Sequence, residues 1–299
     1  MDRLAAMRTF VEIVDRGSLT AAADALGRSQ PAVVRSLAAL EAHLGARLLH
    51  RTTRRMSLTP EGRDYLDRCR RILIDVDEAE QVVSQAGGEP RGDLRLAAPI
   101  QFGQHHVAPA VNAFLDRHPA VRVELQLLDR IVDLVDEGID LALRIGTLAD
   151  SSLVAVRIGA VRRMVCAAPA LLERVGRPSH PRDLEALPCV RFRGLTAFGA
   201  WPFRDAGHDL TARVDGRFVS NQVSTSIGAC VDGLGFGLFL SYQVEAEIRA
   251  GRLVPVLEAY EPEVLPVSLV YPGGRLVSLK LRAMIDWLRE ALPARDVFV

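Results

Sequence analysis

The stretch from Ser18 to Gly62 carries the pattern that most restricts what this chain can fold into. Ser18 is a good N-cap for an Ala-rich helix, and Gly27 is the residue expected just past the end of that helix. A second helix follows Ser29, with Pro31 in its first turn, where the missing N–H removes no hydrogen bond. The spacing predicts two short helices joined by a tight turn and followed by an Arg-rich hairpin.

The second predicted helix has two contrasting faces. Its apolar side chains recur at i, i+4, i+7 and i+11 and so lie within about 60° of arc; they are Val33, Leu37, Leu40 and Leu44. The opposite face is lean and carries one cation; its residues are Pro31, Arg35, Ala38 and Ala42. Such a face suits a helix that enters a DNA major groove, where Arg reaches bases or phosphates and Ala meets thymine methyl groups.

Positive charge is concentrated in this region, although the whole chain balances 37 basic against 37 acidic residues. Between residues 28 and 55 the only acid is Glu41, and the arginines are Arg28, Arg35, Arg47, Arg51, Arg54 and Arg55. A solvated basic surface is one interpretation of this charge. Combined with the helix-turn-helix spacing and the hairpin, the charge favours DNA binding.

Residues 1–62 resemble the winged helix-turn-helix of the LysR-type transcriptional regulators. The resemblance is carried by the motifs GSLTAAADAL, SQPAVVRSLAALEAHLGARLLHRT and SLTPEG. The apolar stripe of the first helix fits as well: Leu4, Met7, Phe10, Val11 and Val14. Val34 stands where the family commonly has Ser. The resemblance covers essentially the whole chain and implies binding to a dyad promoter site in double-stranded DNA. The residues expected to contact DNA are Ser18, Thr20, Ser29, Gln30, Pro31, Ala32, Arg35, Arg51, Thr52, Arg54 and Arg55.

A long helix is predicted after the hairpin, from Glu61 to about Ala86, with Pro60 at its start. Its seam positions alternate three and four residues apart, as in a short coiled coil. They are Leu66, Cys69, Leu73, Val76, Glu80 and Val83, and Glu80 interrupts the apolar pattern. A monomer could instead bury the same stripe against its own head. The resemblance implies that this helix pairs two heads antiparallel and that the working form is a homotetramer. Gly87, Gly88, Pro90 and Gly92 then predict a hinge.

From Asp93 onward strands and helices alternate, which predicts an open α/β sheet. Residues 103–117 and 131–138 read as helices between strands, and a second αβ series begins near Arg162. The resemblance implies an α/β effector-binding domain of two Rossmann-like lobes, similar to periplasmic binding proteins. The expected domains are a head at 1–59, a linker helix at 60–87, a hinge at 88–92 and an effector domain at 93–299. Within that domain we expect lobe I at about 93–161 and 268–299, and lobe II at about 162–267.

A ligand site is expected beyond the C-terminal ends of the strands, where helix N-termini gather. Ser220 and Asn221 are expected to cap a helix over 223–232, and Arg144 could supply a positive charge. The family's effector pocket matches these positions, so we expect a small polar or anionic effector. The candidate residues are Pro99, Ile100, Gln101, Phe102, Gly103, Arg144, Gly146, Thr147, Trp201 and Asn221. Each has an alternative: Pro99 and Gly103 could simply shape a loop, and Arg144 could form a structural ion pair. Asn221 could be a plain helix cap, and Trp201 could pack in the core.

Composition places the chain in a broad class. Its 299 residues predict about two domains, and 49% hydrophobic with 25% charged residues is typical of globular proteins. There is no apolar run of about 20 residues and no signal-peptide core, so we expect a cytoplasmic protein. The four cysteines are scattered, which favours structural thiols over a redox pair or a metal site. No metal or cofactor is expected.

The leading hypothesis is a ligand-responsive transcription regulator that is not an enzyme. An enzyme or small-molecule-binding protein with a winged-helix head is the alternative. The GLGFG segment at 233–237 lacks the G-x-G-x-x-G spacing and follows a helix, so it reads as a helix C-cap and strand start. No P-loop, G-x-S-x-G or H-E-x-x-H motif is present. A purely architectural DNA binder would leave some 200 residues of α/β fold without a role.

Overall fold

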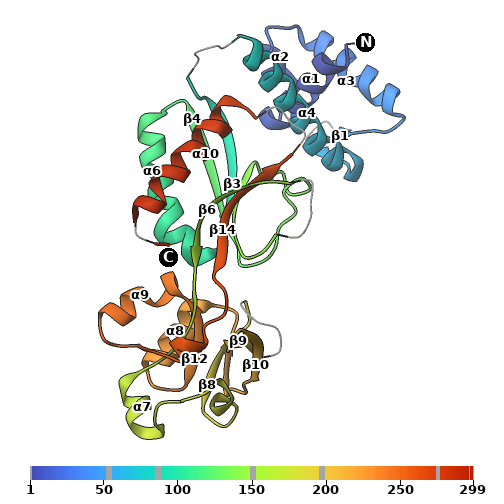
Figure 1. Cartoon of the computed structure of the whole chain (residues 1–299). Coiled ribbons are helices and arrows are strands. Elements are labelled where there is room, and N and C mark those ends of the chain that lie inside the picture. The colour runs from blue at the N-terminus through green and yellow to red at the C-terminus, as the bar shows by residue number, and fades with distance from the viewer. Residues whose placement is uncertain are drawn as a thin grey trace. The chain divides into compact units, whose positions relative to one another are not determined.

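A computed structural model describes residues 2–51, 56–84, 89–148, 153–194, 199–273, 277–295 and 297–298. The chain divides into two compact units, Met1–Gly88 and Glu89–Val299, which are considered one at a time (Figure 1). In the described part of the chain, no helix is both long enough and apolar enough to cross a membrane.

The first unit begins with the three predicted helices, α1 (Arg3–Arg16), α2 (Leu19–Ala25) and α3 (Gln30–Leu44). The predicted caps are confirmed, because the Ser18 hydroxyl accepts the Ala21 N–H at 3.4 Å and Gly27 is left-handed at φ +61°. Ser29 is the N-cap of α3 but makes no side-chain cap bond. Local sequence therefore determines where these helices begin and end.

The core of this unit forms where the apolar faces of the three helices meet. Its fully buried members include Phe10 and Ile13 on α1 and Val33, Leu37 and Leu40 on α3. The expectation for Leu44 is wrong, since its side chain is 38% exposed. Leu44 is the last residue of α3, and Gly45 turns the chain away at φ +66°, so the stripe has no partner there.

The hairpin is confirmed as β1 (Leu49–Arg51) paired antiparallel with β2 (Met56–Leu58). It leads directly into α4 (Pro60–Ser84), and the expected end near Ala86 lies outside the described residues. The first part of the predicted α4 seam packs on the unit's own core, because Leu66 and Cys69 are buried with α1 and α3. In this part of α4, the chain buries the stripe against its own head, which is the alternative to coiled-coil pairing. Residues 85–87 of the expected linker and the start of the expected hinge lie outside the described residues.

The second unit contains two five-stranded sheets, as the alternation of strands and helices predicts. We call the part built on the first sheet lobe I. Its strand order is β4-β3-β5-β14-β6, with β3 parallel to β4 and β5, and β14 antiparallel to β5 and β6. Their bounds are β3 (Gly92–Ala98), β4 (Val121–Leu127), β5 (Leu141–Ile145), β6 (Leu153–Val161) and β14 (Leu265–Pro272).

Helices α6 (Ala108–Arg117) and α10 (Leu279–Ala291) lie together over lobe I (Figure 1). The Trp287 indole N–H donates to the Ala110 carbonyl at 2.8 Å and joins the two helices. α6 continues the short helix α5 (Ile100–Phe102) through one π-helical turn, Gly103–Val107, so the helix predicted from residue 103 begins slightly earlier.

Lobe II is built on the second sheet, in the order β11-β8-β12-β7-β13. The strands are β7 (Arg163–Ala167), β8 (Cys189–Phe192), β11 (Phe218–Ser220), β12 (Phe236–Leu240) and β13 (Val254–Val256). One face packs on α8 (Val223–Val231) and α9 (Ser241–Arg249). The other face packs on α7 (Pro169–Val175), on a 3₁₀ turn at Pro181–Glu185 and on the hairpin of β9 (Ala200–Asp205) and β10 (His208–Arg213).

The helix expected over residues 131–138 is wrong. The Asp133 carboxylate accepts the N–H groups of Val135 and Asp136 at 2.9 and 3.0 Å, which closes a single turn. Gly138 then adopts φ +66°, and the chain enters β5. Side-chain capping by Asp133 and the left-handed Gly138 together stop the turn before a helix can propagate.

Candidate functional site

The face of α3 opposite the core is exposed, as the sequence predicts. Gln30, Pro31, Arg35 and Ala38 are exposed, while Ala32 is half-buried. Thr20 on α2 and the α3 N-cap Ser29 are exposed too. The unit therefore holds a small, cation-bearing helix face in water, supported from behind by fully buried side chains of the same helix.

The hairpin is fixed to α3 by a contact that sequence reasoning missed. The Glu41 carboxylate accepts the N–H of Leu48 at 2.9 Å and that of Leu49 at 3.3 Å. In the sequence, the only signal of this role is that Glu41 is the single acid among the arginines of residues 28–55. Of the predicted hairpin contacts, Thr52, Arg54 and Arg55 lie outside the described residues, as does the side chain of Arg51.

In the second unit, two groups of predicted effector residues share one edge of the lobe I sheet. The segment from Pro99 to Gly103 follows the carboxyl end of β3, and the segment from Arg144 to Thr147 spans the carboxyl end of β5. Because β3 and β5 are parallel neighbours, both ends lie at the same edge of the sheet. Gly103 packs tightly here, since a Cβ on it would lie 2.2 Å from Leu127 Cδ2. The fold thus brings these two segments together as predicted from the strand pattern.

At the start of α5, where an anion is expected to bind, a carboxylate of the chain itself is already bound. The N–H of Ile100 donates to the Asp129 carboxylate at 3.0 Å. Gln101 reaches the other lobe, because its Nε2 donates to the Gln243 carbonyl in α9 at 3.5 Å. Its Oε1 is buried without a hydrogen-bond partner among the described residues. A buried amide oxygen without a donor is costly, so this atom marks a place where a donor group of a ligand would be stabilised.

The remaining predicted effector residues lie in different surroundings. Arg144 Nη2 donates to the Val132 carbonyl at 2.5 Å, so its head is held by the turn before β5. Trp201 is 2% exposed in the core between the β9–β10 hairpin and the lobe II sheet. The cap expected at Ser220 and Asn221 is wrong, because Gln222 is the N-cap of α8 and Ser220 Oγ accepts its N–H at 3.0 Å. Asn221 is exposed.

The cysteines are buried and free in the described structure. Burial raises the pKa of both Cys166 and Cys189 to about 12, and it raises the pKa of Cys230 as well. A thiol whose pKa is raised carries little thiolate and is a weak nucleophile. Among the residues described, no group of three or more His, Cys, Asp or Glu side chains could hold a metal ion.

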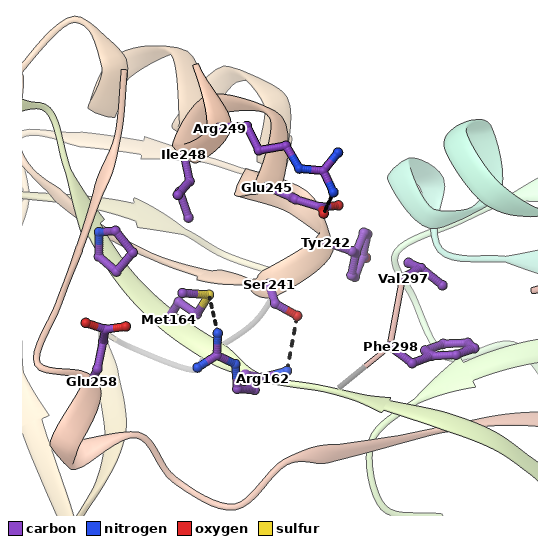
Figure 2. Close-up of a pocket in the computed structure, with 11 residues that line it drawn as sticks. Arg162, Met164, Ser241, Tyr242, Glu245, Ile248, Arg249, Glu258, Val297 and Phe298 are labelled. Carbon is purple, nitrogen blue, oxygen red and sulfur yellow. Dashed lines mark hydrogen bonds and ion pairs between the residues drawn. The ribbon is translucent and has the colours of Figure 1, made fainter. Parts of the chain in front are cut away.

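A pocket of about 370 Å³ opens elsewhere in the second unit, at the junction of β6 and β7 with α9 (Figure 2). Its lining comes from the start of lobe II and from the C-terminal segment; it consists of Arg162, Met164, Ser241, Tyr242, Glu245, Ile248, Arg249, Pro255, Glu258, Val297 and Phe298. None of the predicted effector residues lines it.

Comparison with known proteins gives matches to both units. A family model described as "Bacterial regulatory helix-turn-helix protein, lysR family" matches residues 4–63, and one described as "LysR substrate binding domain" matches residues 87–293. The chain is 35% identical to an HTH-type transcriptional repressor of Pseudomonas aeruginosa, over 97% of this chain and 92% of that protein. It is also 35% identical to the regulator DmlR of Escherichia coli, over 95% of this chain and 91% of DmlR.

Two solved structures are similar along nearly their whole length. CrgA, a LysR-type transcriptional regulator from Neisseria meningitidis, superposes with a TM-score of 0.62 at 31% identity, covering 96% of this chain and 98% of CrgA. AphB, a virulence activator of Vibrio cholerae, gives a TM-score of 0.60 at 25% identity and covers 95% of this chain and 98% of AphB.

Proposed function

The chain belongs to the LysR family of transcriptional regulators, and from that premise we propose that the exposed face of α3 is the surface that enters the DNA major groove. The protein is a DNA-binding regulator with an effector-binding domain, and its family consists of regulators rather than enzymes. The residues proposed to contact DNA are Ser18, Thr20, Ser29, Gln30, Pro31, Ala32, Arg35, Arg51, Thr52, Arg54 and Arg55.

The observation that carries this proposal is the division of α3 into two faces. Val33, Leu37 and Leu40 are fully buried, while Gln30 and Arg35 are exposed on the other side. A surface helix without a partner usually carries Glu and Lys, whereas this face is small and presents Arg, which suits close approach to base edges.

The test starts with selection of a binding site from random duplex DNA by the full chain. Arg35→Ala should weaken binding to that site by about tenfold or more, as expected for the loss of a base contact. Arg16→Ala is the matched control, because Arg16 is exposed on α1 and pairs with Glu12. Equal binding by the Arg35 variant and the wild type would contradict the proposed face.

We further propose that the effector is a small polar molecule held by Pro99–Gly103, Arg144, Gly146, Thr147 and Asn221. Support comes from the shared sheet edge and from the buried Gln101 Oε1, which offers an acceptor to a ligand donor. Trp201 leaves the proposed set because its side chain has almost no surface to offer. Asp129 at the start of α5 disfavours a purely anionic ligand there, since like charges repel.

The effector proposal can be tested separately from DNA recognition. Gln101→Ala and Arg144→Ala should lose the response of DNA binding to an effector found by thermal-shift screening, while both keep the affinity for DNA without effector. Asp129→Asn should raise the affinity for carboxylate ligands over neutral ones. An effector response that survives in both the Gln101 and Arg144 variants would overturn this placement.

We also propose a dimer of dimers that forms in the cytoplasm, where the target DNA lies. Because Leu66 and Cys69 are buried in their own head, pairing through α4 falls to its later part, where Ile72 is 39% exposed. Ile72→Glu should lower the mass of the assembly in analytical ultracentrifugation, and Ile131→Glu is the control at another exposed apolar residue. A tetramer that is unchanged by Ile72→Glu would overturn this role of α4.

A further inference from the structure

The pocket beside α9 has the composition of a small-ligand site. Its volume of about 370 Å³ lies within the range of pockets that bind small molecules. One part of its lining is apolar and combines Met164, Ile248 and Pro255 of lobe II with Val297 and Phe298 of the C-terminal segment. Lobe II and the C-terminal segment therefore both contact anything bound there (Figure 2).

Phe298, which forms the C-terminal wall of this pocket, is tightly packed. The ring of Phe298 lies directly on the backbone of Gly159 in β6, where an added Cβ would be 2.3 Å from Phe298 Cγ. The same ring stacks on Phe102 with centroids 6.1 Å apart, and Phe102 contacts the edge of Tyr242 at 5.0 Å. Glycine at position 159 is what makes room for this ring, so the wall is a packed part of the fold.

Charged side chains complete the pocket, and their signs balance. Two arginines and two glutamates line it, but Glu245 and Arg249 pair with each other along one turn of α9. The other two charged lining residues are Arg162 and Glu258. Figure 2 shows the charged ends of both turned toward the space between the lining residues.

Arg162 and Glu258 do not neutralise each other. In the described part of the chain the side-chain carboxylate of Glu258 has no ion pair and no hydrogen bond, and only its backbone carbonyl accepts, from the Glu261 N–H at 3.2 Å. Arg162 forms an ion pair with Glu261, in which Nη1 donates to the carboxylate at 3.3 Å, and its Nη2 lies 3.9 Å from the Met164 sulfur. Burial raises the pKa of Glu261, and its second carboxyl oxygen has no partner among the described residues. Both contacts are long for a guanidinium, which retains N–H donors for a further acceptor.

From this arrangement we propose that the pocket beside α9 binds a zwitterionic amino acid with an apolar side chain, at a second site distinct from the proposed effector residues. Arg162 binds the carboxylate, Glu258 binds the ammonium group, and the apolar side chain lies against Ile248, Val297 and Phe298. A simple carboxylate would leave Glu258 unpaired beside a second negative charge. A simple amine would place its charge next to Arg162.

Calorimetric titration of the full chain tests the proposal with L-leucine and L-phenylalanine as probes. Each head group is removed in turn with 4-methylpentanoate, which keeps only the carboxylate of leucine, and 3-methylbutylamine, which keeps only the ammonium. We expect the amino acid to bind about tenfold or more tightly than either analogue, as loss of one charged contact implies. Equal binding of one analogue, or no heat with either amino acid at about 10 mM, overturns the proposal.

Variants locate the site. Glu258→Gln, an exposed position at low risk of misfolding, should weaken binding of L-leucine about tenfold. It should not weaken binding of 4-methylpentanoate and should strengthen it, because the carboxylate of that ligand no longer faces a second negative charge. Arg162→Gln should weaken both ligands, with its fold checked by circular dichroism because Arg162 also contacts Glu261. Arg122→Ala on β4 is the control for loss of an exposed cation. Binding that persists in the Arg162 and Glu258 variants but is lost in Arg144→Ala would place the amino acid in the effector site and overturn the second site.

Discussion

Glu41 holds the backbone of Leu48 with its carboxylate, at 2.9 Å from Oε1 to the amide nitrogen. A second bond to the Leu49 N–H at 3.3 Å uses the same oxygen. These two bonds join the end of α3, the helix proposed to contact DNA, to the first strand of the hairpin. One acid in an otherwise basic region therefore determines where the hairpin begins relative to α3.

Replacing Glu41 with Ala should destabilise this junction by about 2 kcal/mol, because two backbone N–H groups lose a charged acceptor. Glu41→Gln keeps an acceptor oxygen and should cost about half as much. Hydrogen exchange of the Leu48 and Leu49 amides measures the effect locally. Glu12→Ala, which removes a surface ion pair with Arg16, should leave this exchange unchanged. Wild-type protection of Leu48 in Glu41→Ala would show that the carboxylate does not hold the hairpin.

Two glycine-to-alanine substitutions should change the free energy of unfolding in opposite directions. At Gly62, near the start of α4, a Cβ would lie 2.0 Å from the Leu48 carbonyl oxygen, which belongs to the backbone and cannot easily move. Gly62→Ala should cost about 2 kcal/mol or more. Gly228 in α8 has nothing within 4 Å of such a Cβ, so Gly228→Ala should stabilise by about 0.5 to 1 kcal/mol. Chemical denaturation followed by circular dichroism measures the free energy of unfolding of both variants. A change in the same direction in both would contradict the packing argument.

The second unit should lose stability in mild acid through His106. Burial, with help from His105 and Arg295, lowers the pKa of His106 from 6.5 to about 4, and its ring packs on Phe102 at 4.9 Å. The unfolded chain therefore binds a proton that the folded chain excludes, so the stabilisation is present above pH 6.5 and is lost as the pH falls toward 4. Since the ring is only half-buried, we discount the contribution to about 1 to 2 kcal/mol.

Tryptophan fluorescence follows this unit, because Trp201 and Trp287 both lie in it. His106→Phe keeps an aromatic ring in the cluster and removes the titration, so its melting temperature should fall less between pH 6.5 and 4.5. His208→Gln, at the exposed end of β10, should behave like the wild type. Parallel acid curves for His106→Phe and the wild type would exclude this source of pH dependence.

The β9–β10 hairpin contains a strained turn that one substitution should relieve. Asp205 pairs with His208 across a two-residue loop, in which Ala206 has φ +47° and Gly207 has φ +85°. Two positive φ angles match a type I′ turn, which favours Asn-Gly, whereas a Cβ on Ala is disfavoured there. Ala206→Asn should stabilise by about 0.5 to 1 kcal/mol, and Ala206→Val should destabilise. Thermal unfolding monitored by Trp201 in the same hairpin checks both changes, and a loss of stability in Ala206→Asn would refute the strain.

Much of the first unit could be predicted from the sequence because the relevant signals are local. Ser18 and Gly27 mark helix ends through contacts within a few residues of each other. The spacing of Val33, Leu37 and Leu40 determines which face of α3 is buried and, by elimination, which face is exposed and proposed to contact DNA. Leu44 departs from this pattern only because the helix ends there.

The sequence by itself thus determined the helix-turn-helix, its basic exposed face and the alternation of strands and helices. Tertiary structure decided what depends on distant partners. Trp201 is in the core because β9 folds back on the lobe II sheet, and residues 131–138 form a turn because Asp133 caps it. The pocket beside α9 joins Arg162, Glu258 and Phe298 across long sequence separations. The spacing of residues along the sequence does not predict that these three side chains lie together. They come together only because the sheets pack and the Phe298 ring packs on Gly159.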